Sequence, residues 1–198
     1  MNLALKLTLV PIALMQTLYI AGKSDIKCMA AKRCNTTTET NATPIAFPTA
    51  EGFGKYATGG RGGQVVTVTS LADTEDKGTL RWAFRQYPGE PLTIVFAVNG
   101  EIHLNSNLRV KRNNWTLAGQ TAPGDGISIV GDKVNFGSSE NFIVRNIRFR
   151  AGDGKQDQAC GAENCTNFIF DHCVFGWSME ENMNTADSHF LTVQYSIV

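Results

Sequence analysis

The stretch Asn167-Phe-Ile-Phe-Asp171-His172-Cys173-Val-Phe-Gly-Trp177 decides the fold class. Its large apolar side chains recur at alternating positions, which is the pattern of a buried strand, and Gly176 marks the corner where this strand should end. Asp171 and His172, with Glu180 and Glu181 just beyond the corner, would lie together at the end of the strand. These four polar residues are therefore the first candidates for a functional site.

The opening of this stretch, a polar residue followed by an aromatic and a branched aliphatic one, recurs along the chain. Strand-like runs begin at Leu92, Asn114, Asn141, Asn167 and His189, 22 to 27 residues apart. A repeat of this length built from strands alone is typical of a solenoid in which each repeat forms one coil. The sequence thus predicts an all-β solenoid. A β-sandwich with irregular loops is the alternative, although the hairpin turn dipeptides that it needs are scarce.

One segment, residues 78–86, has helical character. Leu80, Ala83 and Phe84 fall on one helix face, and Thr79 is suited to be the N-cap. A short amphipathic helix in a β-rich chain needs an apolar surface to cover. We therefore expect it to cap an open end of the stack, where an exposed edge would otherwise promote aggregation.

A glycine-rich stretch, residues 47–63, precedes the first strand-like run at residues 64–70. Glycines in this number can indicate a phosphate loop, but the Gly-x4-Gly-Lys-Ser/Thr pattern is absent and no helix signal follows. The glycines are better interpreted as positions of tight turns and close backbone approach.

The composition limits the classes of function. The chain has 198 residues, 18 basic and 18 acidic side chains, and a formal net charge of zero. Because no basic stripe stands out from the scattered lysines and arginines, nucleic acid is not expected as a partner. The length allows one globular domain at most, preceded by something short.

Residues 1–22 predict a secretory signal peptide, and the protein is expected to be secreted, with no membrane attachment after cleavage. Lys6 precedes an apolar run that Pro11 and Gln16 interrupt, and the run ends in small residues. It is short and broken for a membrane span, although a signal anchor and a buried helix remain alternatives. Residues 23–46 have almost no large apolar side chains and predict a disordered linker, which leaves 47–198 for the solenoid.

Cysteines and glycosylation sequons fit an oxidising compartment. The odd count of five cysteines leaves one unpaired. Cys160 with Cys165, and Cys28 with Cys34, are close enough to close small disulfide loops, whereas Cys173 lies on an apolar run and suits a reduced core position. Sequons, which matter only in a eukaryotic host, occur at Asn35, Asn41, Asn114 and Asn164.

Several ordered motifs lie between residue 47 and the last residue. They are Ala-Glu-Gly-Phe-Gly at 50–54, Gly-Gly-Arg-Gly-Gly at 59–63, Gly-Thr-Leu-Arg at 78–81, and the segments 118–126, 144–150 and 170–172. Together they resemble the pectate lyase family of secreted polysaccharide lyases, within the pectin lyase-like superfamily. The resemblance implies a right-handed parallel β-helix and a calcium-assisted β-elimination that cleaves polygalacturonate. Bound Ca²⁺ would neutralise the uronate carboxylate while a base removes the neighbouring proton.

The resemblance also implies where calcium ligands would lie. Its three positions, counted from the Asp-His pair, are occupied by Gln158, Glu180 and Asn184, so only one retains an acid. Asp157 lies one residue from the first position, and a shift of one residue in a loop would bring it there. The candidate metal ligands are Asp157, Glu180 and Asn184, with Gln158 and Glu181 as supporting residues. Because two formal charges are missing, we expect weak Ca²⁺ binding at most.

For the remaining polar residues the resemblance implies support more than catalysis. Asp171 and His172 would hold adjacent coils together by hydrogen bonds, with an acid/base role for His172 as the alternative. Arg145, Arg148 and Arg150 would form a solvated strand face or contact a substrate carboxylate. The family's proton-abstracting arginine has no counterpart after Glu181, so no catalytic residue is assigned.

Three hypotheses follow for the function. The leading one is the N-terminal part of a secreted pectate lyase-like β-helix, truncated at the C-terminus and inactive in this form. The second is a non-catalytic carbohydrate-binding β-helix, which would bind oligogalacturonate without forming unsaturated product. The third is a structural, adhesin-like solenoid, which would bind neither uronate nor calcium.

Overall fold

The computed structural model of the chain describes residues 43–152 and 158–198. The predicted signal peptide and most of the predicted linker lie outside the described residues. So do Cys28, Cys34, Asn35, Asn41 and Asp157. The linker was predicted to extend to residue 46, but Ala46 already belongs to the described unit, since its backbone N–H donates to the carbonyl of Lys55 at 2.7 Å.

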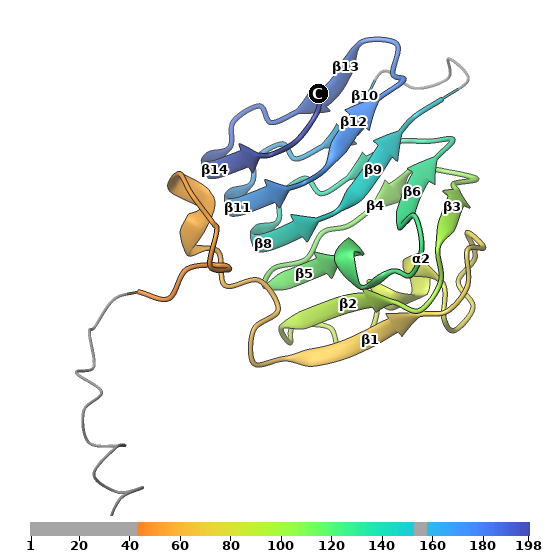
Figure 1. Cartoon of the computed structure of the whole chain (residues 1–198), viewed down its shortest axis with the longest axis horizontal. Helices are drawn as coiled ribbons and strands as arrows, with labels where there is room; N and C mark the ends of the chain where they lie inside the picture. Colours follow the sequence, from red (N-terminus) through yellow and green to blue (C-terminus); the bar gives the residue numbers. More distant parts are fainter. Residues whose placement is uncertain (1–42, 153–157) are drawn as a thin grey trace, which may run out of the picture. The chain divides into compact units, whose positions relative to one another are not determined.

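The described unit is a parallel β-helix, as predicted, with three sheets and strands from successive coils paired in parallel (Figure 1). Sheet A contains β1 (Gln64–Val68), β2 (Leu92–Phe96), β5 (Trp115–Ala118), β8 (Glu140–Arg145), β11 (Thr166–Asp171) and β14 (His189–Gln194). Sheet B contains β3 (Gly100–His103), β6 (Ile127–Val130), β9 (Ile147–Arg150) and β12 (Val174–Gly176). Sheet C contains β4 (Leu108–Arg109), β7 (Val134–Asn135), β10 (Gln158–Gly161) and β13 (Glu181–Asn184). Each full coil therefore visits sheets A, B and C in turn, and the β-sandwich alternative is excluded.

The corners of the coils explain why single predicted strands become two. Asn146 and His172 adopt positive φ angles of 54° each, so the chain turns there from sheet A toward sheet B. Asparagine is among the non-glycine residues that reach this left-handed conformation most readily. The apolar run through Phe170 and Phe175 is consequently split between β11 and β12, and the corner predicted after Gly176 is the second one in this coil.

The recurring asparagine at the start of β5, β8 and β11 has a structural cause. Asn114, Asn141 and Asn167 all have positive φ, and their side chains form a ladder along the stack: Asn141 donates to Asn114, and Asn167 donates to Asn141 at 3.2 Å. The ladder satisfies amide groups that would otherwise be left unpaired at the corner. The repeat seen in the sequence is thus the repeat of one turn.

Aromatic rings stack inside the coils. Trp115, Phe142 and Phe168 occupy equivalent positions in β5, β8 and β11, with ring centroids 4.6 Å apart and nearly parallel planes. Phe149 and Phe175 stack in the same way between β9 and β12, at 5.3 Å. These side chains are fully or almost fully buried and form the centre of the apolar core.

The predicted helix is α2 (Leu80–Ala83), and the Thr79 hydroxyl accepts a hydrogen bond from the Trp82 N–H as an N-cap should. Leu80 is buried, and Phe84 contacts the edge of Trp115 at a centroid distance of 5.3 Å. The helix follows β1, in the first coil, where no strands of sheets B and C precede β3 and β4. It therefore covers the apolar interior at the N-terminal end of the stack.

The glycine-rich segment lies against the outer face of sheet A. Its short helix η1 (Phe53–Tyr56) contacts β11 and β14, and the segment is drawn in orange beside these strands in Figure 1. A Cβ atom on Gly54 would lie 2.1 Å from the carbonyl oxygen of Phe168. The glycines thus permit close backbone approach, as the sequence indicated, and the outward side chains of Ile143 and Ile169 are buried beneath the segment.

The disulfide that the spacing of Cys160 and Cys165 made possible does not form. Both are free thiols, as is Cys173, and all three are buried. Cys160 is on β10 and belongs to the apolar core, whereas the Cys165 Sγ is directed to the carbonyls of Phe136 and Glu163, at 3.3 and 3.4 Å. Burial raises the pKa of Cys173 to about 12.

Candidate functional site

A row of aligned residues crosses the four strands on the outer face of sheet C, and it is called the polar row here because three of its members carry polar side chains and the fourth is a glycine. The register aligns Arg109 on β4 with Asn135 on β7, Gly161 on β10 and Asn184 on β13. Leu108, one position earlier, points into the core instead, because successive residues of a strand face opposite sides. The coil repeat thus gathers polar residues from distant parts of the sequence into one line.

A hydrogen-bonded network lies beside this row. Gln158 and Glu181 are partners in the register of β10 and β13, and the Gln158 Nε2 donates to a Glu181 carboxylate oxygen at 2.8 Å. The Asn184 Nδ2 donates to the same oxygen at 3.1 Å. The structure therefore brings together three of the predicted site residues, and Glu181 accepts from both of its amide neighbours.

The other side of the Gln158 amide faces a cation that the sequence analysis did not identify. The ammonium of Lys133, the residue just before β7, donates to the Gln158 Oε1 and lies 3.7 Å from a Glu163 carboxylate oxygen. The Lys133 side chain is 17% exposed. Its spacing from Gln158, 25 residues, is close to one coil of the repeat, and this was the signal that could have identified it.

The donor set that the described residues offer does not fit calcium. Calcium takes about six to eight oxygen ligands, several of them charged. Here one carboxylate, Glu181, and the amides of Gln158 and Asn184 lie together, and the Gln158 amide oxygen is already bound to the Lys133 ammonium. Over residues 43–152 and 158–198, no group of three or more acidic, histidine or cysteine side chains is arranged to hold a metal ion.

Glu180, the acid expected to be a calcium ligand, lies in the bend before β13 and is exposed. Its side chain makes no hydrogen bond or ion pair with the described residues of the Gln158–Glu181 network. Asp157, the second predicted acid, lies outside the described residues. The ligand assignment of Asp157, Glu180 and Asn184 therefore stays a prediction.

Asp171 and His172 lie elsewhere, at the end of β11 in sheet A, and not with Glu181 on sheet C. The Asp171 side chain is completely buried. It accepts hydrogen bonds from Arg145 Nε at 2.7 Å, Gln194 Nε2 at 2.8 Å and His172 Nδ1 at 3.0 Å. Burial by itself would raise the pKa of Asp171, but these hydrogen bonds outweigh it and hold the pKa below its ordinary value.

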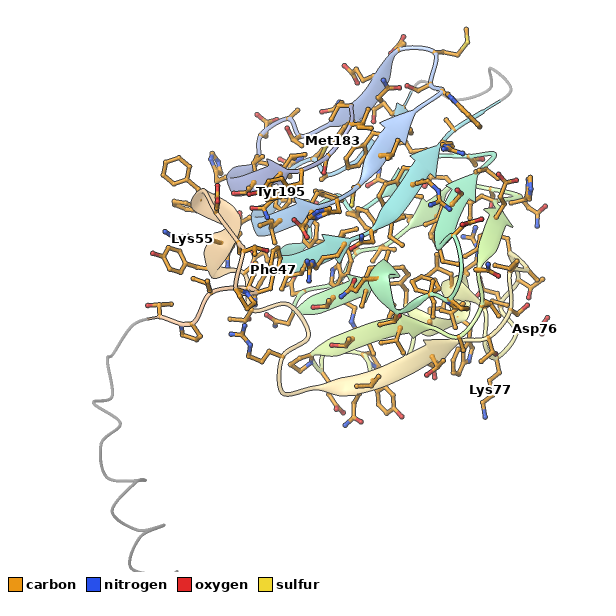
Figure 2. All side chains as sticks on the ribbon, in the orientation of Figure 1. Phe47, Lys55, Asp76, Lys77, Met183 and Tyr195 are labelled. Carbon is orange, nitrogen blue, oxygen red and sulfur yellow. The ribbon has the colours of Figure 1, made fainter. Side chains whose placement is uncertain are left out.

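The contacts of this second cluster are those of a brace between coils. Arg145 and Gln194 come from the coils on either side of Asp171, and the Arg145 guanidinium also lies 4.0 Å from the ring centroid of Phe47. Figure 2 shows Phe47 in the N-terminal segment beside these strands. The His172 ring packs on Tyr195, with centroids 5.3 Å apart. These contacts favour the structural role of the Asp-His pair over acid/base catalysis.

The other two arginines also make local contacts. Arg148 donates to the Ser128 hydroxyl at 2.8 Å and to the Asp125 carbonyl at 2.6 Å, and Arg150 stacks over Trp177 at 4.4 Å. Both lie on sheet B, so they do not adjoin the polar row of sheet C.

Two of the predicted glycosylation sequons lie in the described part of the chain. Asn164 is exposed, in the turn between sheets C and A. Asn114 is half-buried, and its side-chain oxygen accepts a hydrogen bond from Asn141 within the ladder. Of the two, Asn164 is the better placed to carry a glycan.

Comparison with known proteins gives relatives but no matching family model. The chain is 41% identical over 157 residues to the probable pectate lyase C of Aspergillus flavus and 42% identical over 158 residues to that of Emericella nidulans. Each alignment covers 78% of this chain and 36% of the relative, so the chain spans about a third of the length of these relatives. Pectate lyase 1 of Ambrosia artemisiifolia is 38% identical over 102 residues, which are 50% of this chain and 24% of that protein.

Among solved structures, the 1.7 Å crystal structure of jun a 1, the major allergen from cedar pollen, has a similar fold. Its TM-score is 0.60 at 22% identity, with 73% of this chain and 47% of that chain covered. The stacked coils and this likeness define a protein of the parallel β-helix class. The sequence relatives are more specific: over most of its length the chain is related to the pectate lyases, which confirms the resemblance of its motifs.

Proposed function

We propose that the protein binds polygalacturonate across the outer face of sheet C and takes part in the eliminative degradation of pectate. The observation that carries this proposal is the polar row from Arg109 to Asn184, on coils related to proteins named pectate lyase. The row runs from coil to coil along the axis of the stack, so a linear polysaccharide lying on it would contact one coil after another. The exposed guanidinium of Arg109 and the Lys133 ammonium would attract its carboxylates.

Cleavage by β-elimination requires a base for the proton next to the uronate carboxylate and a positive charge to stabilise the anion that forms. Calcium, implied by the resemblance, would supply that charge, but the donors that residues 43–152 and 158–198 offer do not fit it. The misfit between calcium and the donors of the described residues favours a second candidate function, carbohydrate binding without catalysis.

A single assay separates the two functions. The purified chain is incubated with polygalacturonate, with Ca²⁺ and with a chelator, and the absorbance of unsaturated uronide is followed. Binding of oligogalacturonate is measured in parallel by calorimetry. Product formation supports the lyase, and binding without product supports the non-catalytic protein. Folded protein that neither binds nor cleaves would contradict both and leave the structural solenoid.

We also propose that the protein is secreted, with residues 1–22 as its signal peptide and Asn164 as a glycosylation site in a eukaryotic host. The apolar leader and the exposure of Asn164 support this. Among the described residues, no helix is long and apolar enough to cross a bilayer. Mass spectrometry of the protein from culture medium would test both points, because an uncleaved N-terminus or an unmodified Asn164 would contradict them.

A further inference from the structure

We propose that the Lys133 ammonium is the built-in cation of the sheet C site, so that the site binds a uronate carboxylate without a metal ion. This inference rests on the proposed function, because it takes polygalacturonate as the ligand. It concerns the charge that neutralises the carboxylate, and it departs from the calcium that the family resemblance implies.

The first support is the space made for the lysine. A Cβ atom on Gly161 would lie 2.9 Å from the Lys133 Cε and 3.2 Å from its Nζ. The lysine side chain therefore passes directly over Gly161, across the face of β10. A side chain at this position would make the flexible end of the lysine move from where it lies. The glycine thus leaves space for the ammonium within the polar row.

The second support is the orientation of the Gln158 amide. Its oxygen accepts from the Lys133 ammonium, and its nitrogen donates to Glu181 at 2.8 Å. An amide has both an acceptor and a donor, so it suits a position between a cation and a carboxylate. An aspartate here would accept from Lys133 but would repel Glu181. Gln158 therefore matches a site that contains a lysine, and its single oxygen is not free for a metal.

The third support is the number of hydrogen bonds that the ammonium can donate. It has three N–H donors. In the described residues its oxygen neighbours are two, the Gln158 amide at hydrogen-bond distance and the Glu163 carboxylate at 3.7 Å. One donor remains for a ligand, and the side chain is partly open to solvent. A uronate carboxylate supplies an acceptor of the right charge, and Arg109 on β4 would face a carboxylate further along the polymer.

Binding of trigalacturonate is measured by calorimetry in EDTA for the wild-type chain, Lys133→Gln, Lys133→Arg and the control Lys77→Gln. Lys77 is an exposed lysine before α2, and Figure 2 shows that it lies far from Met183 of β13. We expect wild-type binding to persist in EDTA and to weaken about tenfold or more in Lys133→Gln, since a charged hydrogen bond is lost. Lys133→Arg should retain most of the affinity, and Lys77→Gln all of it. Binding that needs added Ca²⁺, or equal affinity of Lys133→Gln, would overturn the inference.

A second measurement does not depend on the sugar. The thermal unfolding midpoint is recorded with and without millimolar Ca²⁺ for the wild type and for Lys133→Gln combined with Gln158→Asp. We expect no shift for the wild type and an upward shift for the double variant, because the cation is removed and a carboxylate is added beside Glu181. A calcium-induced shift in the wild type would overturn the inference even if the proposed function holds. A different outcome would count against the proposed function alone: neither the wild type nor any variant binds trigalacturonate, while calcium shifts the unfolding midpoint of the double variant and not that of the wild type.

Discussion

At the scale of single residues, Asp171 shows how a buried charge can be structural. Its carboxylate is fully buried and accepts from Arg145, Gln194 and His172. Asp171→Asn would leave the Arg145 guanidinium without its carboxylate, and we expect a loss of about 3 kcal/mol in the free energy of unfolding. Urea denaturation would measure it, with the exposed Asp125→Asn as a control that should change little. A neutral effect of Asp171→Asn would contradict the brace.

The same residue predicts a pH dependence. Because its pKa is lower in the folded protein than in the unfolded chain, the stabilisation is complete above the unfolded pKa of about 3.9 and is lost as the pH falls through the folded value. The difference in unfolding free energy between wild type and Asp171→Asn should therefore shrink below about pH 4. Denaturation curves from pH 7 to pH 3 would show this, and a difference that stays constant with pH would argue against it.

The thiols give a further expectation at this scale. Burial raises the pKa values of Cys160, Cys165 and Cys173, so their thiols should resist alkylation at pH 8 in the native protein and react after unfolding. Peptide mapping after iodoacetamide treatment would read each site separately. A peptide linked through Cys160 and Cys165 would contradict the free thiols.

Site residues were only partly predictable at this scale. Gln158, Asn184 and Glu181 do meet on sheet C, because the spacing taken from the family places residues about one coil apart on neighbouring strands. Lys133 could not be found among possible metal ligands, because a lysine ammonium has no lone pair to offer a metal ion. Asp171 was grouped with Glu181 by sequence proximity, but the two corners between them carry the chain from sheet A to sheet C.

At the scale of elements, the strands of sheet A were predictable and the other strands mostly were not. Sheet A strands have four to six residues, and β5, β8 and β11 share an asparagine at their start and an aromatic residue in phase. Strands β4 and β7 have two residues each, too few to show a period. The corner at His172 was hidden because neither glycine nor proline marks it, and because apolar alternation continues on both sides of the turn.

Glycines of the N-terminal segment can be tested as an element. Gly54→Ala would place a Cβ against the Phe168 carbonyl, and that backbone atom cannot move without disturbing β11. We expect η1 to detach from sheet A, with a loss of stability of about 1–3 kcal/mol and faster proteolysis before β1. Gly176→Ala is the matched control, since a Cβ there would meet nothing within 4 Å. Equal protease sensitivity of the two variants would contradict this account.

At the scale of the whole molecule, stability comes from like side chains repeated along the axis. Phe142 stacks on Trp115 on one side and on Phe168 on the other. Phe142→Ala should therefore cost about 3–5 kcal/mol, measured by chemical denaturation, because it opens a cavity in the middle of the stack. Phe190→Ala, at a ring that is 63% exposed, should have a small effect. Comparable losses in both variants would mean that the stack is not the main source of stability.

The N-terminal segment also bears on the order in which the molecule folds. Glu51, Gly54 and the Thr49 carbonyl hydrogen-bond to Gln194 and Thr192 of β14, across 138 to 145 residues of sequence. Contacts between such distant residues form slowly, because a long loop must close first. On the ribosome this segment leaves the exit tunnel before any coil exists, yet its docking surface is completed only when β14 has been synthesised. The first of the described residues to be made are thus the last to reach their place, and until then the outer face of sheet A is open to chaperones.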